Sequence, residues 1–509
     1  FRRVLFRSHR DRGETGAMSS SYDGLRIPVV AAERLAAWGD HPVIRELQPG
    51  REPRAILAAD YRSRIGELAA RLRAEGVGEN TAVALFLENS IDHLVMLFAL
   101  FELGAVPVIA KLEYRSIELD EIFENADPAV VATEAGHLEV LAPYLDGRHV
   151  IERGPEGFRT TQHGPRVSGT ATAGGRLRAA PDVPDGTASI NYTYRGLGYP
   201  VGVLVTHAQY LHGADVLQDG LYGYPGESMM FSIPISHIFT LIGCVLVPLR
   251  YGMTAVIART IHPRMIFEYF DTYGIEHVTA VPEIYRLLHR ALPEGRRFPE
   301  LRTFVSGGSL LAAEEHGPIA QAFDLDFLHG YGLTEFTPAS RNIRGRARAG
   351  TIGPVCGGVE CRIAEGGPGS TAGGRVVAGG SVAGEVLLRT DTMSGAYYRR
   401  PEVSRQADAD GWFRTGDIGR FEDGHLVFER EHKRTCKVGG VMVDLEEVKK
   451  ALRMHPEVHD AHVEFRDGAV EAGLEVPSSA DFEETQREIR AFLKPRIAAY
   501  KVPRRFYRP

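Results

Sequence analysis

The N-terminal part of the sequence alternates two hydrophobic patterns. Apolar side chains recur at helical spacing over Tyr61–Glu75 and over Ile91–Leu103, whereas Val83–Leu87 and Val106–Ala110 are short, continuous apolar runs. Short apolar runs bounded by glycine or polar turns are typical of buried strands. The repeated order of strand, helix and strand over about Ser21–Thr133 therefore predicts βαβ units and a parallel sheet.

A second series of the same kind follows a segment without periodicity. Gly154–Gly186 is rich in Gly, Pro, Thr and Arg and is predicted to be a linker or an exposed insertion. The patterns after it predict more βαβ units. The strands expected there are Val203–Val205, Met229–Pro234, Ala255–Ile257, His277–Val281 and Thr303–Val305, and the helices include Arg264–Tyr273 and Pro282–Ala291.

The C-terminal third has a different pattern of apolar and polar residues. From Gly350 onward, short runs with glycine and proline turns predict an all-β subdomain with a Gly-rich loop at Gly366–Gly384. After about Arg434, a hairpin (461–465 and 472–476) and an amphipathic helix (483–493) predict a small α+β unit. The expected fold class is α/β. It comprises a large N-terminal domain of βαβ-built sheets plus a small β subdomain, residues 18–432, followed by a small mobile α+β C-terminal domain, residues 433–509.

The composition excludes several classes of protein. The 509 residues carry a formal net charge of −7, whereas dedicated nucleic-acid binders are normally basic. The four cysteines form no C-x-x-C pair, so they are expected to be isolated thiols in a reducing, cytoplasmic compartment. No run of about 20 apolar residues predicts a membrane span. Residues 1–17 are Arg-rich and precede Met18, and we expect a disordered or artefactual leader there.

Two glycine-containing segments are candidates for binding phosphate. The first is Tyr192–Gly202 (YTYRGLGYPVG), followed by Thr206 and His207. Backbone N–H groups in such a loop bind anions without side chains, although a plain strand–turn–strand fits a Gly-rich turn equally well. The second is Gly330–Glu335 (GYGLTE), in which a hydroxyl followed by a carboxylate suits a phosphate and its Mg²⁺. An exposed turn is the alternative interpretation of the second segment.

Two later segments carry a carboxylate and a lysine. In Trp412–Asp417 (WFRTGD) the aspartate follows a tight glycine turn, where it can accept ribose hydroxyls or, alternatively, close an Asx-turn. In Ala499–Pro503 (AYKVP), Lys501 lies on a stiff extended segment and is a point charge suited to phosphate and carboxylate oxygens. Taken alone, such a lysine is more often a plain surface residue.

The order and spacing of all four segments resemble the adenylate-forming superfamily of acyl-CoA synthetases, aryl-acid ligases, luciferases and nonribosomal adenylation domains. The resemblance extends from about Leu35 to Phe506. The phosphate loop of that family reads roughly YTSGTTGxPKG followed by TH. The matching residues here are Tyr192, Thr193, Gly198, Pro200, Gly202, Thr206 and His207. The GE(L/V)…GY…(R/N)PE block of the family resembles residues 384–386 and 395–402.

This resemblance implies ATP, Mg²⁺ and CoA as cofactors, with a small-molecule carboxylic acid as the partner substrate. It implies that Lys501 is the catalytic lysine, that Thr334 touches phosphate, that Glu335 holds Mg²⁺, and that His237 lies at the acyl pocket. A satisfied core histidine is the alternative for His237. The residues expected to bind nucleotide or line the approach of the thiol are Thr193, Arg195, Gly196, Gly198, Gly307, Gly308, Ser309, Tyr331, Gly332, Asp417, Arg430, Lys433, Gly439 and Gly440.

The sequence departs from the family pattern in two places. In the phosphate loop, Tyr194–Leu197 replaces small hydroxyl and glycine positions, and Val201 replaces the lysine. We hypothesise that Arg195 replaces that lysine; the alternative is that Arg195 points outward and the loop amides suffice. At the hinge, the family's GRxK reads REHK, so that either Arg430 or Glu431 takes the place of the usual arginine.

The expected reaction is the ATP-dependent conversion of an acid to acyl-AMP, followed by transfer of the acyl group to CoA. Family members that activate α-amino acids place an Asp in the region of Phe231–Phe239 to pair with the ammonium group, and this segment contains no acidic residue, which favours an uncharged aromatic or polycyclic acid. The rewritten phosphate loop resembles those of aryl and polycyclic acid–CoA ligases of natural-product pathways, which implies such a pathway here. The alternatives are loading of an acyl carrier protein and a non-catalytic adenylate-binding protein. Family members rotate the C-terminal domain between the two steps, so that Lys501 leaves and Gly439–Gly440 lines the thiol's approach.

Overall fold

The computed structural model describes residues 22, 24–162, 176–221, 223–336, 338–364, 376–377, 382–393, 396–404, 411–431, 434–477 and 481–508. The expected leader at residues 1–17, most of the Gly-rich loop at 366–384, and Lys433 lie outside these residues.

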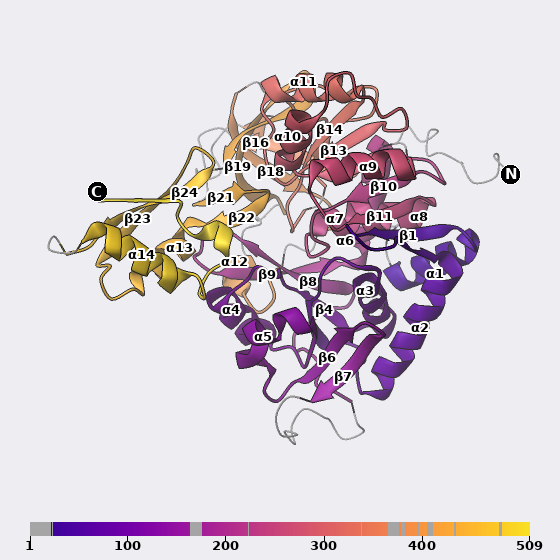
Figure 1. Ribbon diagram of the computed structural model, residues 1–509, viewed down its shortest axis with the longest axis horizontal. Helices are drawn as coiled ribbons and strands as arrows, with labels where there is room; N and C mark the ends of the chain where they lie inside the picture. The colour runs from indigo at the N-terminus through magenta and orange to yellow at the C-terminus, as the bar shows by residue number, and fades with distance from the viewer. Residues whose placement is uncertain are drawn as a thin grey trace.

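Two large sheets form the body of the molecule (Figure 1). The first has seven strands in the order β7-β6-β5-β3-β4-β8-β9, and the second has eight in the order β15-β14-β13-β12-β10-β11-β1-β2. The strands of the first sheet are β3 (Ala82–Phe86), β4 (Val106–Ile109), β5 (Val130–Glu134), β6 (His149–Gly154), β7 (Gly157–Gln162), β8 (Thr187–Tyr194) and β9 (Pro200–Thr206). The strands of the second are β1 (Pro42–Leu47), β2 (Arg54–Leu57), β10 (Ser228–Phe231), β11 (Thr254–Ala258), β12 (His277–Ala280), β13 (Thr303–Ser306), β14 (Asp326–Tyr331) and β15 (Ser340–Arg341).

Helices pack on both faces of each sheet. The largest buried cluster contains side chains of both sheets and of the helices between them, whereas two smaller clusters cover the outer faces. The helices of the largest cluster are α1 (Ile27–Trp38), α2 (Ala58–Ala74), α3 (Ile91–Leu103), α6 (His207–Leu221), α7 (Ile238–Thr240) with the following π-turn η4 (Leu241–Leu246), and α8 (Val247–Tyr251). The outer faces are covered by α4 (Ser116–Ala126) and α5 (Leu138–Leu145), which follows the short turn η3 (Ala135–His137), and by α9 (Pro263–Tyr273), α10 (Pro282–Ala291) and α11 (Ala313–Phe323).

Helix α3 shows why the sequence forms a helix between two sheets. It is apolar on every side, which is typical of a helix with no face in water, and almost all of its residues are buried. The Ser90 hydroxyl caps its first turn by accepting a hydrogen bond from the His93 N–H at 3.1 Å. Gly104 ends it in the left-handed region, with φ of 66°.

The third sheet and the C-terminal unit complete the fold. The third sheet is antiparallel, in the order β17-β16-β18-β19-β20, and the C-terminal unit has a buried cluster of its own. In Figure 1 this unit (yellow) lies beside α4 and β9. The bounds in the third sheet and its flank are β16 (Glu360–Ala364), β17 (Val376–Val377), β18 (Gly384–Arg389), α12 (Pro401–Ser404), β19 (Phe413–Glu422) and β20 (His425–Glu431). Those in the C-terminal unit are β21 (Thr435–Val438), β22 (Val441–Asp444), α13 (Leu445–Arg453), β23 (Asp460–Arg466), β24 (Ala469–Glu475), α14 (Phe482–Leu493), η5 (Ala499–Lys501) and β25 (Arg505–Tyr507).

The predicted α/β fold class is confirmed, and two details of the sequence interpretation are wrong. Part of the expected linker is the edge strand β7, which pairs antiparallel with β6; its Arg and Thr side chains suit a strand with one face in water. The run at Val203–Val205 belongs to β9, which pairs antiparallel with β8 in the first sheet and does not begin the second. A buried apolar run has the same appearance in either sheet, so pairing could not be read from the pattern.

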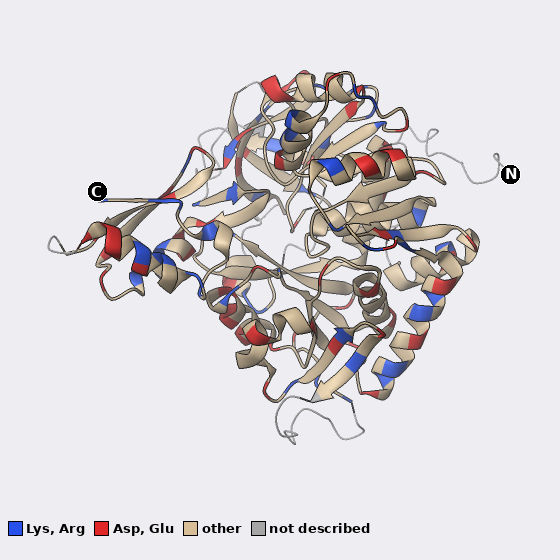
Figure 2. Ribbon diagram, in the orientation of Figure 1, with Lys and Arg blue, Asp and Glu red and all other residues tan. Residues whose placement is uncertain are grey.

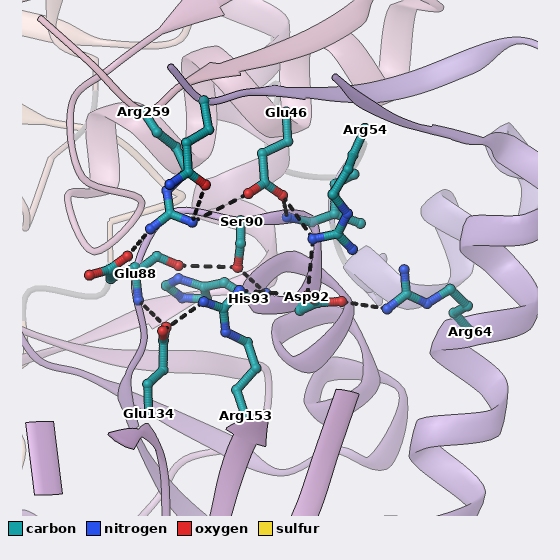
Figure 3. A network of polar contacts seen from close by, with 12 residues as sticks. Glu46, Arg54, Arg64, Glu88, Ser90, Asp92, His93, Glu134, Arg153 and Arg259 are labelled. Atoms are coloured by element: carbon teal, nitrogen blue, oxygen red, sulfur yellow. Dashed lines mark hydrogen bonds and ion pairs between the residues drawn. The ribbon is translucent and has the colours of Figure 1, made fainter. Parts of the chain in front are cut away.

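A charged network ties the two large sheets together near the start of α3 (Figure 3). Asp92 of α3 faces Arg64 of α2 at 2.5 Å and Arg153 of β6 at 3.5 Å. Glu46 of β1, in the second sheet, lies 3.4 Å from Arg54, which also contacts Asp92 at 3.5 Å. Burial would raise the pKa of Asp92, but the arginines outweigh it and hold that pKa below its usual range. The network therefore stabilises the junction in its ionised form.

Charged residues of both signs occur along the outer helices, α2 and α14 among them (Figure 2). Within the part of the chain that the structure describes, no helix is long and apolar enough to span a bilayer.

Candidate functional site

One cavity brings several of the predicted segments together. Its walls follow the carboxyl ends of β10, β13 and β14, the edge of an α/β sheet at which ligands commonly bind. The end of β8, helix α6 and the turn between β21 and β22 complete it. The predicted residues that line it are Thr193, Arg195, His237, Gly307, Gly308, Tyr331, Gly332, Thr334, Glu335 and Gly440. Gly196, Gly198, Ser309, Asp417, Arg430, Gly439 and Lys501 lie outside this lining.

The predicted phosphate loop is the turn between β8 and β9. Gly196 and Gly198 adopt positive φ of 76° and 77°, which only glycine adopts freely, so the chain can reverse sharply there. The Gly198 N–H donates to Asp444 Oδ2 at 3.0 Å, and Lys450 Nζ donates to the carbonyls of Leu197 and Gly198, each at 3.3 Å. A carboxylate of the C-terminal unit therefore occupies a backbone donor of the loop in this arrangement.

Glu335 is buried at the wall of the cavity. Its Oε1 accepts a hydrogen bond from the Tyr397 hydroxyl at 2.5 Å and lies 3.7 Å from Arg195 Nη1. Arg195 points inward, against the alternative considered from the sequence: it stacks 5.0 Å above the Phe413 ring and donates to the Arg414 carbonyl at 3.0 Å. Burial and the nearby Glu335 carboxylate raise the pKa of Tyr397, so its hydroxyl stays protonated and remains a donor.

Asp417, Ser309 and Arg430, three other residues expected to bind nucleotide, do not line the cavity. Asp417 accepts a hydrogen bond from the Tyr331 hydroxyl at 2.6 Å, so it touches the cavity through a residue that lines it. Ser309 donates to both carboxylate oxygens of Glu283 at 3.2 Å. Arg430 is exposed on β20, and the neighbouring Glu431 accepts from the Thr435 hydroxyl at 3.0 Å.

Lys501 is fully buried at the junction between the C-terminal unit and the N-terminal body. Its ammonium group lies 2.6 Å from Glu118 Oε1 on α4, 2.5 Å from Glu447 Oε2 on α13 and 2.6 Å from the Tyr194 hydroxyl. Burial raises the pKa of Glu447, while Lys501 opposes that rise. We call these four side chains the Lys501 cluster. In this arrangement Lys501 does not itself line the cavity but contacts it through Tyr194, which does.

The family follows from comparison with known sequences. Residues 32–398 match the family described as AMP-binding enzyme, which is more than half of the chain. The chain belongs to this family. Its members are enzymes, which agrees with the adenylate-forming resemblance of the sequence motifs.

Named relatives cover nearly the whole chain. The sulfoacetate–CoA ligase of Cupriavidus necator is 26% identical over 94% of this chain and 93% of that protein. The long-chain-fatty-acid–CoA ligase of Thermus thermophilus is 29% identical over 85% of this chain and 82% of that protein. Among solved structures, the amide bond synthetase McbA of Marinactinospora thermotolerans superposes with a TM-score of 0.79 at 24% identity, covering 94% of this chain and 96% of that one. These structural likenesses support the fold.

The histidine at the expected acyl pocket is neutral at physiological pH. Burial, assisted by Lys111 and Lys437, lowers the pKa of His237 to about 3. Its Nδ1 accepts a hydrogen bond from the Phe239 N–H at 3.3 Å, which leaves Nε2 as the protonated nitrogen. His237 can therefore act in the cavity of this AMP-binding enzyme as a neutral donor.

Sequence reasoning missed several residues that contact or line the cavity. Lys111, Arg341 and Lys437 line it, and Tyr397 holds Glu335. Lys111 comes two residues after the end of β4, so a charged residue just after a buried strand was a signal that could have found it. Burial and the nearby Lys501 lower the pKa of Lys111 to about 8. Arg341 had no such signal, because its approach to α6 depends on the pairing of β14 with β15.

Proposed function

We propose that the protein is an AMP-forming acid–CoA ligase, which converts a carboxylic acid to acyl-AMP and then to its CoA thioester. One observation carries the proposal. Arg195 and Glu335 share a single cavity with Gly440 of the C-terminal unit, so groups suited to phosphate chemistry and the expected approach of the thiol meet in one place. Membership of the AMP-binding enzyme family and the names of the relatives support it.

In the first step a carboxylate oxygen of the acid attacks the α-phosphorus of ATP, and pyrophosphate leaves. No general base is needed, since the nucleophile is already ionised. The barrier is electrostatic, because two anions must approach, so cationic groups and loop amides that face the phosphates lower it. Arg195 can supply one such group from within the cavity. Lys501 would have to leave its cluster to supply another.

Glu335 fits the expected Mg²⁺. Among the described residues no group of three or more His, Cys, Asp and Glu side chains could hold a metal ion. Mg²⁺ commonly binds one or two carboxylates together with substrate phosphates and water, so one buried carboxylate at the cavity wall is sufficient. Glu335 would hold the ion through its carboxylate, beside the contacts that Oε1 makes with Tyr397 and Arg195. The ion would neutralise phosphate charge when it is bound.

In the second step the thiol of CoA attacks the acyl carbon and AMP leaves. Gly440 packs against Val281 beside Gly308, where a Cβ on Gly440 would approach Val281 Cγ1 to 2.5 Å, so a side chain there would obstruct this docking. The Lys501 cluster and the Asp444–Gly198 contact hold the C-terminal unit in the same place. This arrangement resembles the one that the family uses for thiol transfer.

The finer substrate class remains part of the proposal. The apolar side chains that line the cavity include Leu217, Leu221, Phe239, Val305 and Leu328, which suits the apolar body of an aromatic or polycyclic acid. A natural-product pathway and a cytoplasmic location belong to the same proposal. Transfer to an acyl carrier protein in place of CoA is the second candidate for the acceptor.

The test is pyrophosphate release from ATP with a panel of aryl, alicyclic and fatty acids, with CoA or with a phosphopantetheinylated carrier protein as acceptor. We expect acid-dependent release that requires Mg²⁺ and a thioester that forms with CoA. Glu335→Gln should remove the Mg²⁺-dependent turnover and leave the thermal unfolding temperature nearly unchanged. If the thioester formed only on the carrier protein, the carrier would replace CoA as the acceptor in the proposal. ATP binding without any turnover would refute the ligase activity.

A further inference from the structure

The cavity lining contains an arginine that the proposed chemistry of adenylation does not use. Arg341 of β15 lines the cavity together with Leu217 and Gly220 of α6. We expect acyl-AMP formation to place the reacting carboxylate beside Thr334 and Glu335, which follow β14. Arg341 is paired with Gly330 in the antiparallel pair of β14 and β15. Gly330 precedes Thr334 and Glu335 in the chain. Gln209 of α6 donates to the Thr334 carbonyl at 3.1 Å, whereas Arg341 donates to the Val216 carbonyl further along the same helix. These two contacts lie about 10 Å apart along the helix, so Arg341 lies away from the segment at which the carboxylate is expected to react.

The protein fixes this guanidinium along one edge. Arg341 Nε donates to the Val216 carbonyl of α6. A Cβ on Gly220 would approach Nε to 2.5 Å and Cζ to 2.9 Å, so the absence of a side chain at Gly220 lets the guanidinium lie against the helix. A bond through Nε leaves the two terminal nitrogens to form a fork, the geometry that matches a carboxylate.

The polar neighbours of Arg341 are already satisfied within the protein. Asn342 donates to the carbonyls of His329 and Thr351 at 3.1 and 2.9 Å, and its side-chain oxygen accepts from the Arg348 N–H at 2.9 Å. The Ser340 hydroxyl donates to the Ile352 carbonyl at 2.9 Å. The ion pairs among the described residues do not include Arg341. A cation in a mostly apolar cavity is costly without an anion, so a ligand carboxylate would find a ready partner here.

We infer that the acid carries a second anionic group, a carboxylate or a sulfonate, at its end remote from the reacting carboxylate, and that this group pairs with Arg341. The inference rests on the proposed ligase function and narrows its substrate class. It also changes the expectation of an uncharged acid, which was based on Phe231–Phe239 alone. The apolar lining between the two ends accommodates the body of such an acid.

The test compares acids that differ only in the remote group. Terephthalate and glutarate are each paired with the monoamide of the same skeleton, and kcat/KM is measured from pyrophosphate release with CoA present. For at least one skeleton we expect the dianionic acid to be preferred about 10- to 100-fold, the usual effect of a charged hydrogen-bonded pair. Arg341→Gln should abolish this preference and leave the rate with the monoamide within a few-fold of the wild type.

Two further variants keep the test decisive. Arg346→Gln alters an exposed arginine of the same segment and should preserve the preference. If Arg341→Gln loses activity with both acids, the same comparison is made with Arg341→Lys, because this variant keeps the positive charge. A retained preference for the dianionic acid then supports the pairing. The inference would be overturned if the wild type used the monoamides as efficiently as the dianionic acids, or if the preference survived in an active Arg341→Gln variant. Either result would leave the ligase function standing. No turnover of any acid would overturn both.

Discussion

At the scale of single residues, the contacts of Arg195 and Lys501 differ from those of ordinary surface cations. Arg195 reaches the cavity from the phosphate loop and lies 3.7 Å from Glu335. Lys501 is held by two carboxylates and a phenol, at a site with no exposed surface. The roles of the two residues therefore need different experiments.

Arg195→Ala is expected to weaken the use of ATP in adenylation by about one to two orders of magnitude, since a charged hydrogen bond contributes about 1.5–3 kcal/mol. Transfer of the acyl group from supplied acyl-AMP to CoA should change little, because no β- or γ-phosphate is then present. The measurement is the kcat/KM for ATP in each half-reaction, with Arg195→Lys as the charge-preserving control. Unchanged ATP kinetics would mean that the loop acts through its backbone amides.

Lys501→Ala is expected to reduce adenylation by about 10²–10³-fold, the usual loss for one aligned charged donor. The sequence alone predicts that thioester formation from supplied acyl-AMP survives. The structure predicts a partial loss in that step too, because Glu118 and Glu447 would face each other at a buried junction without their cation.

Lys494→Ala, which changes an exposed lysine of the same unit, is the matched control for that variant. Combining Lys501→Ala with Glu118→Gln removes one of the two stranded carboxylates, and it should restore the thioester step without restoring adenylation. Full thioester activity in Lys501→Ala alone would show that the Lys501 cluster does not stabilise this arrangement.

At the scale of elements, two junctions depend on charge in different ways. Helix α13 begins at Asp444, whose Oδ1 accepts from the N–H groups of Glu446 and Glu447 at 2.9 and 3.3 Å while Oδ2 accepts from Gly198. One carboxylate thus caps a helix and holds the phosphate loop, and a phosphate bound at the Gly198 N–H would compete with it. The junction of α2, α3 and the two sheets instead relies on the network around Asp92 (Figure 3).

Arg64→Gln is expected to lower the free energy of unfolding by about 1 kcal/mol, a modest value because the arginine is partly exposed and its charge is screened. Arg62→Gln changes an exposed arginine of the same helix, α2, and should have almost no effect. Urea unfolding at low and high salt measures both variants, and the difference between them should shrink in high salt. Equal stability of the two variants would show that the pair of Arg64 and Asp92 adds nothing.

At the scale of the whole molecule, buried histidines set a limit on stability in acid. His93 is buried in the same junction, and burial, assisted by Arg153, lowers its pKa to about 3. In the unfolded chain a histidine takes up a proton near pH 6.5. Between these two values only the unfolded chain binds the proton, so stability falls as the pH falls from about 6.5 towards 3.

For this one group the loss amounts to at most about 1.4 kcal/mol per pH unit. His93→Gln should therefore reduce the dependence of the urea midpoint on pH between pH 6.5 and 4.5. His262→Gln, which changes an exposed histidine before α9, should leave that dependence unchanged. An identical pH dependence in the wild type and His93→Gln would show that His93 does not titrate in this way.

Local sequence patterns were enough to predict the class of fold and most of its elements. Helix α3 and strands β3, β10 and β12 follow from local apolar patterns, because a chain that is apolar on every side can be stable only between layers. Motif order was enough to indicate the family, since the spacing of glycines, hydroxyls and charges in the phosphate loop, in Gly330–Glu335 and around Lys501 is local information.

The tertiary structure alone decided which of these residues share a site. Arg195 faces Glu335, Arg341 lies against α6, and Lys501 pairs with Glu118, although each pair is more than a hundred residues apart in the chain. Strand order and the docking of the C-terminal unit create these pairs, and neither leaves a trace in local periodicity. Burial, which lowers the pKa of His237 and leaves Arg341 in a mostly apolar cavity, is likewise a property of the packed molecule, because the dielectric around a side chain depends on what surrounds it.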